Sequence, residues 1–342
     1  MAALTSGPEP AATTASPSPP PVRISIVIPV YRGERTLEPL ITEIVPLTEP
    51  SSTPGGLRFV VGDIVLVNDG AVDGSSGVMT ALATRHPFVV PLWLSRNYGQ
   101  HAATLAGMAS TSGEWVVTLD EDGQHNPKDI GVLLDEAIAT GCSLVYSRAV
   151  NPPPHGWLRN LLSRGAKRVV SLLVGSDRIG LFQSFRLVDG EVARSLAAYC
   201  GQGVYLDIAL GWVVDRVSTA PVTLRQEGDR PSGYNLVKLF SHFWRLVLTA
   251  GTRPLRMIAL LGGFSILVAV AVMFKAFLDK YLHQVPVAGW TSLIVVLSFF
   301  SGVILFSLSV IAEYIGLTLN MAMGRPTYLV VYHPPRPRRR TP

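Results

Sequence analysis

Apolar residues between positions 24 and 147 fall into two alternating patterns. Short runs that are apolar at nearly every position are separated by longer stretches in which apolar residues recur at helical spacing. Strands of a parallel sheet are buried on both faces, and uninterrupted apolar runs are typical of them. The pattern predicts strands over residues 24–30, 63–69, 88–94, 114–120 and 143–147, and helices over residues 36–47, 75–85, 100–110 and 127–140. This alternation predicts a doubly wound α/β domain.

Two much longer apolar stretches lie in the last third of the chain. Residues 257–274 and 284–312 contain no charged side chain over 18 and 29 residues, enough for helices to cross a hydrocarbon core of about 30 Å. The first stretch is marginal unless Lys275 extends its ammonium group to the interface and residues 276–278 join the helix. A buried core helix can have the same composition, but two such stretches in tandem favour a pair of transmembrane helices.

Basic residues flank this pair on its outer sides. They are Lys238, Arg245, Arg253 and Arg256 before it, and Arg325, Arg336, Arg338, Arg339 and Arg340 after it. The connecting segment offers only Lys275 and Lys280 against Asp279. The positive-inside rule therefore predicts a multi-pass membrane protein whose globular domain and both termini are cytoplasmic. These basic residues explain most of the net charge of +5, so the charge does not require a nucleic-acid partner.

The predicted elements divide the chain into five parts. Residues 1–22 are rich in Ala, Ser, Thr and Pro and lack an apolar core segment, so we expect a disordered leader. The α/β domain covers residues 23–230, and residues 231–254 form a juxtamembrane amphipathic helix. The two-helix transmembrane region covers residues 255–318, and residues 319–342 form a cytoplasmic tail.

Two amphipathic stretches are expected to bring the domain into contact with membrane lipids. Residues 157–174 place leucines and valines on one helical face and Arg or Lys on much of the other. Residues 234–248 repeat this design, with Phe243 and Trp244 among the aromatic side chains. A soluble amphipathic helix is the alternative for each, but the neighbouring apolar spans favour helices that lie in the membrane interface.

Unusual polar residues gather where the predicted strands end. They are Tyr31, Glu34, Asn68, Asp69, Arg96, Asn97, Asp120 and Asp122. Ligands of doubly wound sheets bind outside the carboxyl ends of the strands. The stretch "TLDEDGQHNP" places Asp120, Glu121 and Asp122 together, and their repulsion would be relieved by a divalent cation, Mg²⁺ or Mn²⁺, shared with a diphosphate. An Asp-x-Asp pattern also occurs in ordinary loops, so the pattern alone leaves both interpretations open.

Several of these stretches resemble a known family in order and spacing. "SIVIPVYRGE", "VNDGAVDGS", "LSRNYGQHAATLAGM" and "VTLDEDGQHNP" resemble the family 2 glycosyltransferases, which have the GT-A fold. "RNYGQH", "TRPLRMIALLG", and "AEYIG" followed by "GRPTYLV" resemble the polyprenyl-phosphate glycosyltransferases with two membrane spans, a group that includes bacterial undecaprenyl-phosphate glucosyl and aminoarabinose-type transferases. The resemblance covers residues 24 to 331. It implies a bacterial inner-membrane enzyme and a homo-oligomer, since relatives are often tetramers.

The resemblance implies a role for each matching residue on the donor side. Pro29, Tyr31 and Glu34 would form the loop that packs on the nucleoside, and Asp69 would accept a hydrogen bond from the base. The sequence departs from the family pattern beside Asp69, with Asn68 in place of an Asp and Ala71 in place of a Ser, which leaves the base less certain.

The same resemblance implies a metal site. Asp120 would contact ribose or metal, Asp122 would be the direct ligand, and Gln124 would complete the site. Glu121 and Gly123 replace a small residue and an apolar residue, and the resemblance implies no role for Glu121.

The acceptor side is expected to be basic, because the planar guanidinium fork suits phosphate. Arg225 and Arg230 resemble an Arg-rich loop of the family, although the following Gly-Ser-x-Tyr pattern is altered here around Ser232. Arg253 and Arg256 lie at the membrane edge, where they either meet a lipid phosphate or anchor the topology. Arg186 matches a family Arg that serves either phosphate or folding. Asp207 is the candidate general base, with a helix-face or capping role as its alternative.

The resulting expectation is a metal-dependent, inverting transfer of one sugar from a nucleotide-sugar to polyprenyl (undecaprenyl or decaprenyl) phosphate. The expected donor is a UDP-sugar. An ionised acceptor phosphate needs positioning more than deprotonation, since its second pKa lies near 6. Two alternatives remain open at this point. One is a processive polysaccharide synthase, although the sequence lacks a Gln-x-x-Arg-Trp stretch. The other is a catalytically silent membrane scaffold that keeps the fold.

Overall fold

The computed structural model describes residues 19–151, 180–201, 203, 205–225, 253–283 and 289–333. Four predictions lie wholly or largely outside these residues: the leader, the interfacial helix over 157–174, the juxtamembrane helix within 231–254, and the sites at Arg230 and Ser232. These stay predictions.

The described part of the chain forms one nine-stranded sheet, with strand order β8-β6-β7-β5-β1-β3-β4-β9 and β2 paired to β3. The strands are β1 (Val22–Val30), β2 (Ser51–Ser52), β3 (Arg58–Asn68), β4 (Val89–Leu94), β5 (Trp115–Thr118), β6 (Leu144–Ala149), β7 (Arg186–Asp189), β8 (Val217–Val222) and β9 (Val330–Val331). All five strands predicted from the apolar runs are present, with ends that differ by up to five residues.

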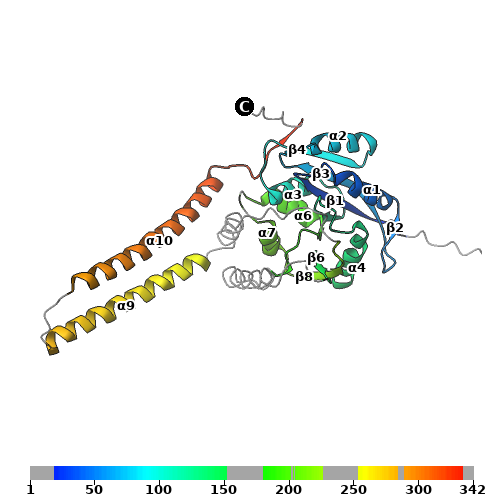
Figure 1. Ribbon diagram of the computed structural model, residues 1–342. Coiled ribbons are helices and arrows are strands. Elements are labelled where there is room, and N and C mark those ends of the chain that lie inside the picture. Colours follow the sequence, from blue (N-terminus) through cyan, green and yellow to red (C-terminus); the bar gives the residue numbers. More distant parts are fainter. Residues whose placement is uncertain are drawn as a thin grey trace, which may run out of the picture.

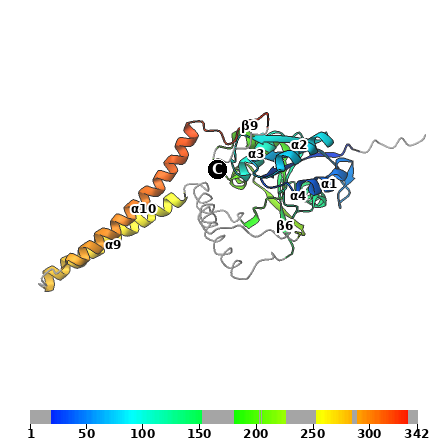
Figure 2. The ribbon, with the colours of Figure 1, turned by 45° about the horizontal axis from the view of Figure 1, so that its top comes forward.

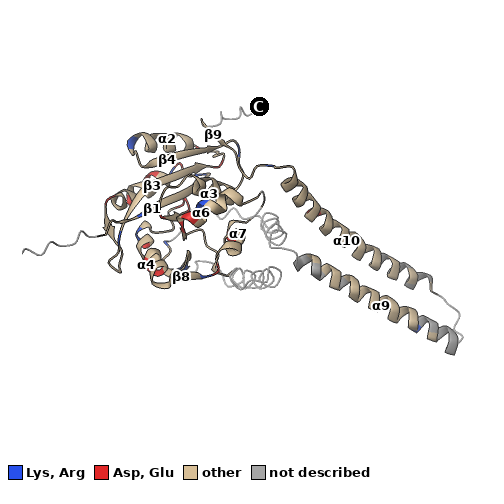
Figure 3. Cartoon of the chain, turned by 180° about the vertical axis from the view of Figure 1, so that it is seen from behind, with Lys and Arg blue, Asp and Glu red and all other residues tan. Residues whose placement is uncertain are grey.

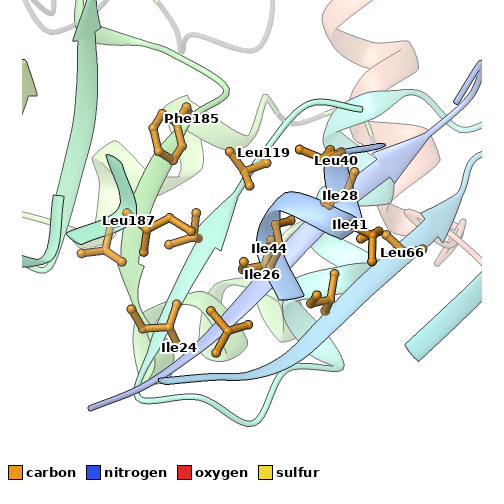
Figure 4. Close-up of a cluster of buried hydrophobic side chains, with 14 of the residues drawn as sticks. Ile24, Ile26, Ile28, Leu40, Ile41, Ile44, Leu66, Leu119, Phe185 and Leu187 are labelled. Carbon is orange, nitrogen blue, oxygen red and sulfur yellow. The ribbon is translucent and has the colours of Figure 1, made fainter. Parts of the chain in front are cut away.

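Helices cover both faces of the sheet, as a doubly wound fold requires. They are α1 (Leu37–Ile44), η1 (Val45–Thr48), α2 (Ser75–Arg85), α3 (Gln100–Ala109), η2 (Pro127–Asp129), α4 (Ile130–Thr140), α6 (Gly190–Tyr199) and α7 (Leu206–Val213). Buried side chains of α1, α2 and α4 pack on one face, where isoleucines and leucines of β1 and β3 form the core shown in Figure 4. Buried side chains of α3, α6 and α7 pack on the other face.

The five predicted strands (β1, β3, β4, β5 and β6) are parallel to one another, as expected, and the sheet is mixed only because it also contains antiparallel strands outside the prediction. β1 pairs in parallel with β3 and β5, and β6 with β8, but β7 lies antiparallel between β5 and β6. Thr118 of β5 faces Arg186 of β7 in this register. β7 has only four residues and does not belong to the helix-strand alternation that marks the other strands, so the apolar pattern did not reveal it.

Strands β1, β3 and β5 end at the same edge, because β1 lies between the other two and runs parallel to both. Their following loops therefore converge at one rim of the sheet. α1 leaves this rim toward one face and α3 belongs to the other face, so the rim is the switch point at which ligands of doubly wound folds bind.

Two long helices, α9 (Arg253–His283) and α10 (Trp290–Ala322), extend from the α/β domain as a pair (Figures 1 and 2). Their membrane-length apolar windows are Ile258–Lys275 and Phe299–Ala322. Large apolar side chains point outward, with Leu260 74% and Leu267 68% exposed. The central parts of both helices are drawn in tan in Figure 3, the colour of residues other than Lys, Arg, Asp and Glu. The first window agrees with the predicted span, whereas α10 begins after residue 284 and continues past residue 312.

The segment after α10 returns to the α/β domain. Thr327 Oγ1 donates to the Cys200 carbonyl at 2.9 Å, and the Ser95 amide donates to the Leu329 carbonyl at 2.9 Å. Val330 and Val331 then form β9, an edge strand antiparallel to β4. The predicted tail over residues 319–342 is therefore corrected in its first part, because α10 runs to Ala322 and β9 joins the main sheet.

Candidate active site

A pocket of about 420 Å³ opens at the rim where β1, β3 and β5 end. Such a volume suits a small-molecule ligand. The pocket is lined by Pro29, Val30, Tyr31, Asp69, Asn97, Gly99, Gln100, Asp120, Glu121 and Asp122. Five residues predicted for the donor site (Pro29, Tyr31, Asp69, Asp120 and Asp122) are thus brought together, although they come from three separate strands.

Asp69 anchors the loop that follows β4. Its carboxylate accepts hydrogen bonds from the amides of Tyr98 at 2.6 Å and Gly99 at 2.9 Å. The two loops touch closely, since a Cβ on Gly70 would lie 2.7 Å from the Asn97 amide nitrogen, and Gly70 has φ +67°. Burial raises the pKa of Asp69 to about 6, although the Tyr98 and Gly99 hydrogen bonds favour the charged form.

Glu34 fixes the loop after β1 instead of lining the pocket. Its Oε2 accepts from the Gly74 amide at 3.1 Å, and its own amide donates to Asp73 Oδ2 at 3.3 Å. The Gly33 amide donates to Ser75 Oγ at 2.8 Å. The loop that carries Tyr31 is therefore held against the start of α2, and among these residues Tyr31 is the pocket-lining one.

Asp120 is held in a defined orientation at the end of β5. Gln100 Nε2 donates to its Oδ1 at 2.6 Å, and Ser184 Oγ donates to its Oδ2 at 2.5 Å. Burial raises the pKa of Asp120, and the negative charge of Asp122 raises it further. Asp122 Oδ1 accepts the Gln124 amide at 3.0 Å, which bends the chain after the strand.

The donor set at this turn fits a divalent cation that is shared with a phosphate ligand. No three His, Cys, Asp or Glu side chains within the described ranges form a complete metal site. Asp120 and Asp122 supply at most two carboxylates, and Gln124 can add an amide oxygen. Mg²⁺ is commonly bound by one or two carboxylates, with substrate phosphates and water as its other ligands. The two acids therefore suit a cation that binds together with a diphosphate.

His125 adds a buried group beside these acids. The side chain is 8% exposed, and its ring centroid lies 5.0 Å from that of Phe185. Nδ1 has no hydrogen-bond partner among the residues that the structure describes. Burial lowers the pKa of His125 even though Asp120, Asp122 and Asp129 favour its charged form, so the neutral ring is the stable species at neutral pH.

Asp207 lies behind the pocket in a buried ion pair. Arg186 Nη1 donates to Asp207 Oδ1, and both side chains are less than a tenth exposed. Tyr146 Oη also donates to Asp207 Oδ1 at 2.8 Å, and Arg186 Nε donates to Thr118 Oγ1 at 3.1 Å. Burial disfavours the charged guanidinium, but Asp207, Tyr146 and Asp120 together outweigh this effect and raise the pKa of Arg186. This geometry favours the folding role for Arg186 and does not bring Asp207 to the pocket lining.

Arg225 lies next to the metal turn, which is the turn of residues 120–124 that carries the candidate metal ligands. Its amide donates to the Gln124 carbonyl at 2.9 Å, and its guanidinium donates to Asn126 Oδ1 at 3.2 Å. It also forms an ion pair with Glu43 at 2.8 Å, with both side chains about 40% exposed. Arg253 and Arg256 lie in the first turn of α9, at the domain end of the helix pair.

Two residues of the pocket region were not identified as Asp120 partners by the sequence pattern. Gln100 is the first residue of α3, and the pattern of polar residues at strand ends gave no reason to pair it with Asp120. Ser184 carried no signal, because it reaches Asp120 through the antiparallel strand β7 that follows it.

Comparison with known proteins agrees with the expected family. The family model for glycosyl transferase family 2 matches residues 25–186. Undecaprenyl-phosphate 4-deoxy-4-formamido-L-arabinose transferase of Pseudomonas paraeruginosa is 31% identical, over 90% of this chain and 89% of the relative. Bactoprenol glucosyl transferase of Shigella phage SfX is 26% identical, over 90% of this chain and 99% of the relative.

A solved structure of glucosyl-3-phosphoglycerate synthase from Mycobacterium tuberculosis, in complex with Mn²⁺, UDP and glucosyl-3-phosphoglycerate, is also similar. It is 20% identical, covers 68% of this chain and 80% of the solved chain, and has a TM-score of 0.47. The full-length similarity to the Pseudomonas transferase, together with the family 2 match over the first strands, confirms the expected family and the expected glycosyltransferase class. The chain belongs to the family 2 glycosyltransferases, in the group of polyprenyl-phosphate sugar transferases.

Proposed function

We propose that this protein transfers one sugar from a nucleotide-sugar donor to polyprenyl phosphate at the cytoplasmic face of a bacterial inner membrane. The observation that carries the proposal is the acidic pocket at the rim of the sheet, in a domain continuous with two apolar helices. The names of the similar transferases support the acceptor, because both specify an undecaprenyl-type (bactoprenol) lipid.

The donor would occupy the pocket with its nucleoside between Tyr31 and Asp69 and its diphosphate beside Asp120 and Asp122. The pocket lining supports this arrangement, since these four residues lie along it. Mg²⁺ or Mn²⁺ held by Asp120, Asp122 and Gln124 would neutralise charge on the leaving diphosphate. We propose that the donor is UDP-linked and that Asp69 is the hydrogen-bond partner of its base.

The reaction forms one bond and breaks one bond at the anomeric carbon. A phosphate oxygen of the acceptor attacks that carbon from the face opposite the leaving group, which inverts its configuration. The bond to the donor diphosphate breaks, and the nucleoside diphosphate leaves with the bonding electrons. The acceptor phosphate is mostly ionised at neutral pH, so no side chain has to remove a proton first.

Arginines would position the acceptor phosphate. Arg225 is the candidate whose side-chain contacts the structure describes, and its backbone and side chain both contact the metal turn. Arg230, Ser232, Arg253 and Arg256 complete the proposed set. Asp207 is given no base role in this proposal, because its carboxylate is buried and already pairs with Arg186 and Tyr146.

Release of the nucleoside diphosphate tests the proposal. Purified protein in lipid nanodiscs would be incubated with Mn²⁺ and a panel of UDP- and GDP-sugars, with and without undecaprenyl phosphate. We expect release that requires both metal and lipid phosphate, with one sugar on each lipid. Chain elongation would instead indicate a processive synthase, and absence of release with every donor would indicate a silent scaffold. Size determination of the same sample tests the expected homo-oligomer.

A further inference from the structure

Glu121 lies between the two proposed metal ligands, yet its carboxylate is bound elsewhere. Its Oε2 accepts the Tyr31 amide at 3.0 Å, and its Oε1 accepts the Arg32 amide at 2.9 Å. Each oxygen of one carboxylate thus binds one of two consecutive backbone amides. Hydrogen bonds to a charged acceptor are about twice as strong as neutral ones.

The contact joins two loops that the sheet no longer connects. β1 and β5 are paired from Ile24 to Val27, and the Leu119 amide still donates to the Val27 carbonyl at 3.0 Å. Beyond this point the chains separate toward the pocket. The loops remain in close contact at Glu121, since a Cβ on Gly33 would lie 2.8 Å from Glu121 Oε2.

We infer that Glu121 is a positioning residue that fastens the nucleoside loop at Tyr31 and Arg32 to the metal turn at Asp120 and Asp122. The inference rests on the proposed function, because it assigns the two fastened segments to the nucleoside and the diphosphate of one donor. Glu121 would set the distance between these two parts of the site without binding the cation. A role as third metal ligand would take the carboxylate from both amides.

Two substitutions test this role. Glu121→Ala removes both acceptors, whereas Glu121→Gln keeps one acceptor oxygen and removes the charge. The matched control is Glu114→Gln, because Glu114 Oε1 accepts the Arg23 amide at 3.0 Å at the other end of β1, away from the pocket. The full-length variants in nanodiscs would be compared by hydrogen exchange of peptides that contain Tyr31 and Arg32, by Mn²⁺ binding alone, and by UDP binding with Mn²⁺ present.

We expect faster exchange at Tyr31 and Arg32 in Glu121→Ala and about tenfold weaker UDP binding, with a smaller effect in Glu121→Gln. The KM for the donor should rise more than kcat falls. Binding of Mn²⁺ alone should stay within about twofold of the wild type, since a positioning residue gives the cation no ligand. Glu114→Gln should leave all of these measurements unchanged.

Two results would overturn the inference. Loss of Mn²⁺ binding in the absence of nucleotide would make Glu121 a metal ligand, and unchanged exchange with unchanged UDP binding would leave it without a positioning role. If the wild type bound no nucleoside diphosphate, the proposed function would fail, whereas the exchange comparison would still decide whether Glu121 holds the loop.

Discussion

The acidic rim at Asp120 and Asp122 differs sharply from the ion pair of Asp207 and Arg186 behind it. Both regions carry acids that the sequence offered as catalytic groups. The rim acids line an open pocket, whereas Asp207 is 5% exposed and has a guanidinium and a phenol as partners. An acid without a counter-charge in a pocket can bind a cation, whereas a buried acid that is already paired is not available to one, and removal of its partner destabilises the fold. Residue type alone therefore does not decide the role.

The largest effect is expected for Asp122→Asn. The amide oxygen can still accept the Gln124 amide at the turn, so the fold should persist while the charge that attracts the cation is lost. We expect sugar transfer to fall by about 100-fold or more, because charge on the leaving diphosphate is no longer neutralised. Metal-dependent release of nucleoside diphosphate measures this loss.

The control is Asp129→Asn, because Asp129 belongs to the short helix η2 and does not line the pocket. Its activity should remain close to that of the wild type. Turnover retained by Asp122→Asn at saturating Mn²⁺ would remove Asp122 from the metal site.

Substitutions in the ion pair of Asp207 and Arg186 should change folding stability instead of the rate of sugar transfer. Asp207→Leu leaves Arg186 buried without its counter-charge, and the expected loss of folding stability is about 3 kcal/mol. The double variant Arg186→Met with Asp207→Leu should recover much of this loss, since a buried pair can be replaced by apolar groups of similar volume. Thermal unfolding in detergent measures both changes.

Activity of the double variant then separates the two roles of Asp207. Recovery of transfer together with stability would support a purely structural pair. A variant that is stable but inactive would assign a catalytic role to this region.

The same difference explains how far the sequence could predict the molecule. The apolar runs predicted the main strands, and the ends of β1, β3 and β5 predicted most of the pocket, because parallel strands must end at a common edge. The burial of Asp207 could not be predicted, since its partner Tyr146 lies 61 residues away in the sequence. The role of Glu121 could not be predicted either. Its carboxylate binds the backbone amides of Tyr31 and Arg32, and any residue type other than proline provides such an amide, so no sequence motif marks the contact.

Asp69 should make donor binding at the rim depend on pH. Its raised pKa of about 6 means that the carboxylate, which holds the Tyr98 and Gly99 amides, is present above that pH and lost below it. We expect affinity for a UDP-sugar to fall about tenfold from pH 7 to pH 5, in line with the ionised fraction. Folding stability should change in the opposite sense. Between pH 3.8 and about 6 the folded state holds a proton that the unfolded state releases, so the contribution of Asp69 to stability falls as pH rises through that window.

Asp69→Asn provides the baseline for this measurement. The affinity of this variant for the UDP-sugar should be lower than that of the wild type at pH 7 and should change little between pH 7 and pH 5. Any remaining pH dependence in the variant comes from titration of the ligand or of other groups. If affinity changed with pH equally in the wild type and in Asp69→Asn, Asp69 would not be the group that causes the pH dependence.

The smallest effect is expected at the edge of the rim, where Glu43 neutralises Arg225. An exposed ion pair contributes about 0–1 kcal/mol to stability, so Glu43→Gln should leave unfolding nearly unchanged. If Arg225 positions the acceptor phosphate, its released charge should lower the KM for undecaprenyl phosphate about twofold at low salt, and the difference should vanish near 1 M salt, where the Debye length is about 3 Å. The matched control is Glu38→Gln, which breaks the exposed pair of Glu38 and Arg85 and leaves the metal turn untouched. An equal shift in both variants would show that the effect comes from net charge, and an unchanged KM in Arg225→Ala would remove Arg225 from the acceptor site.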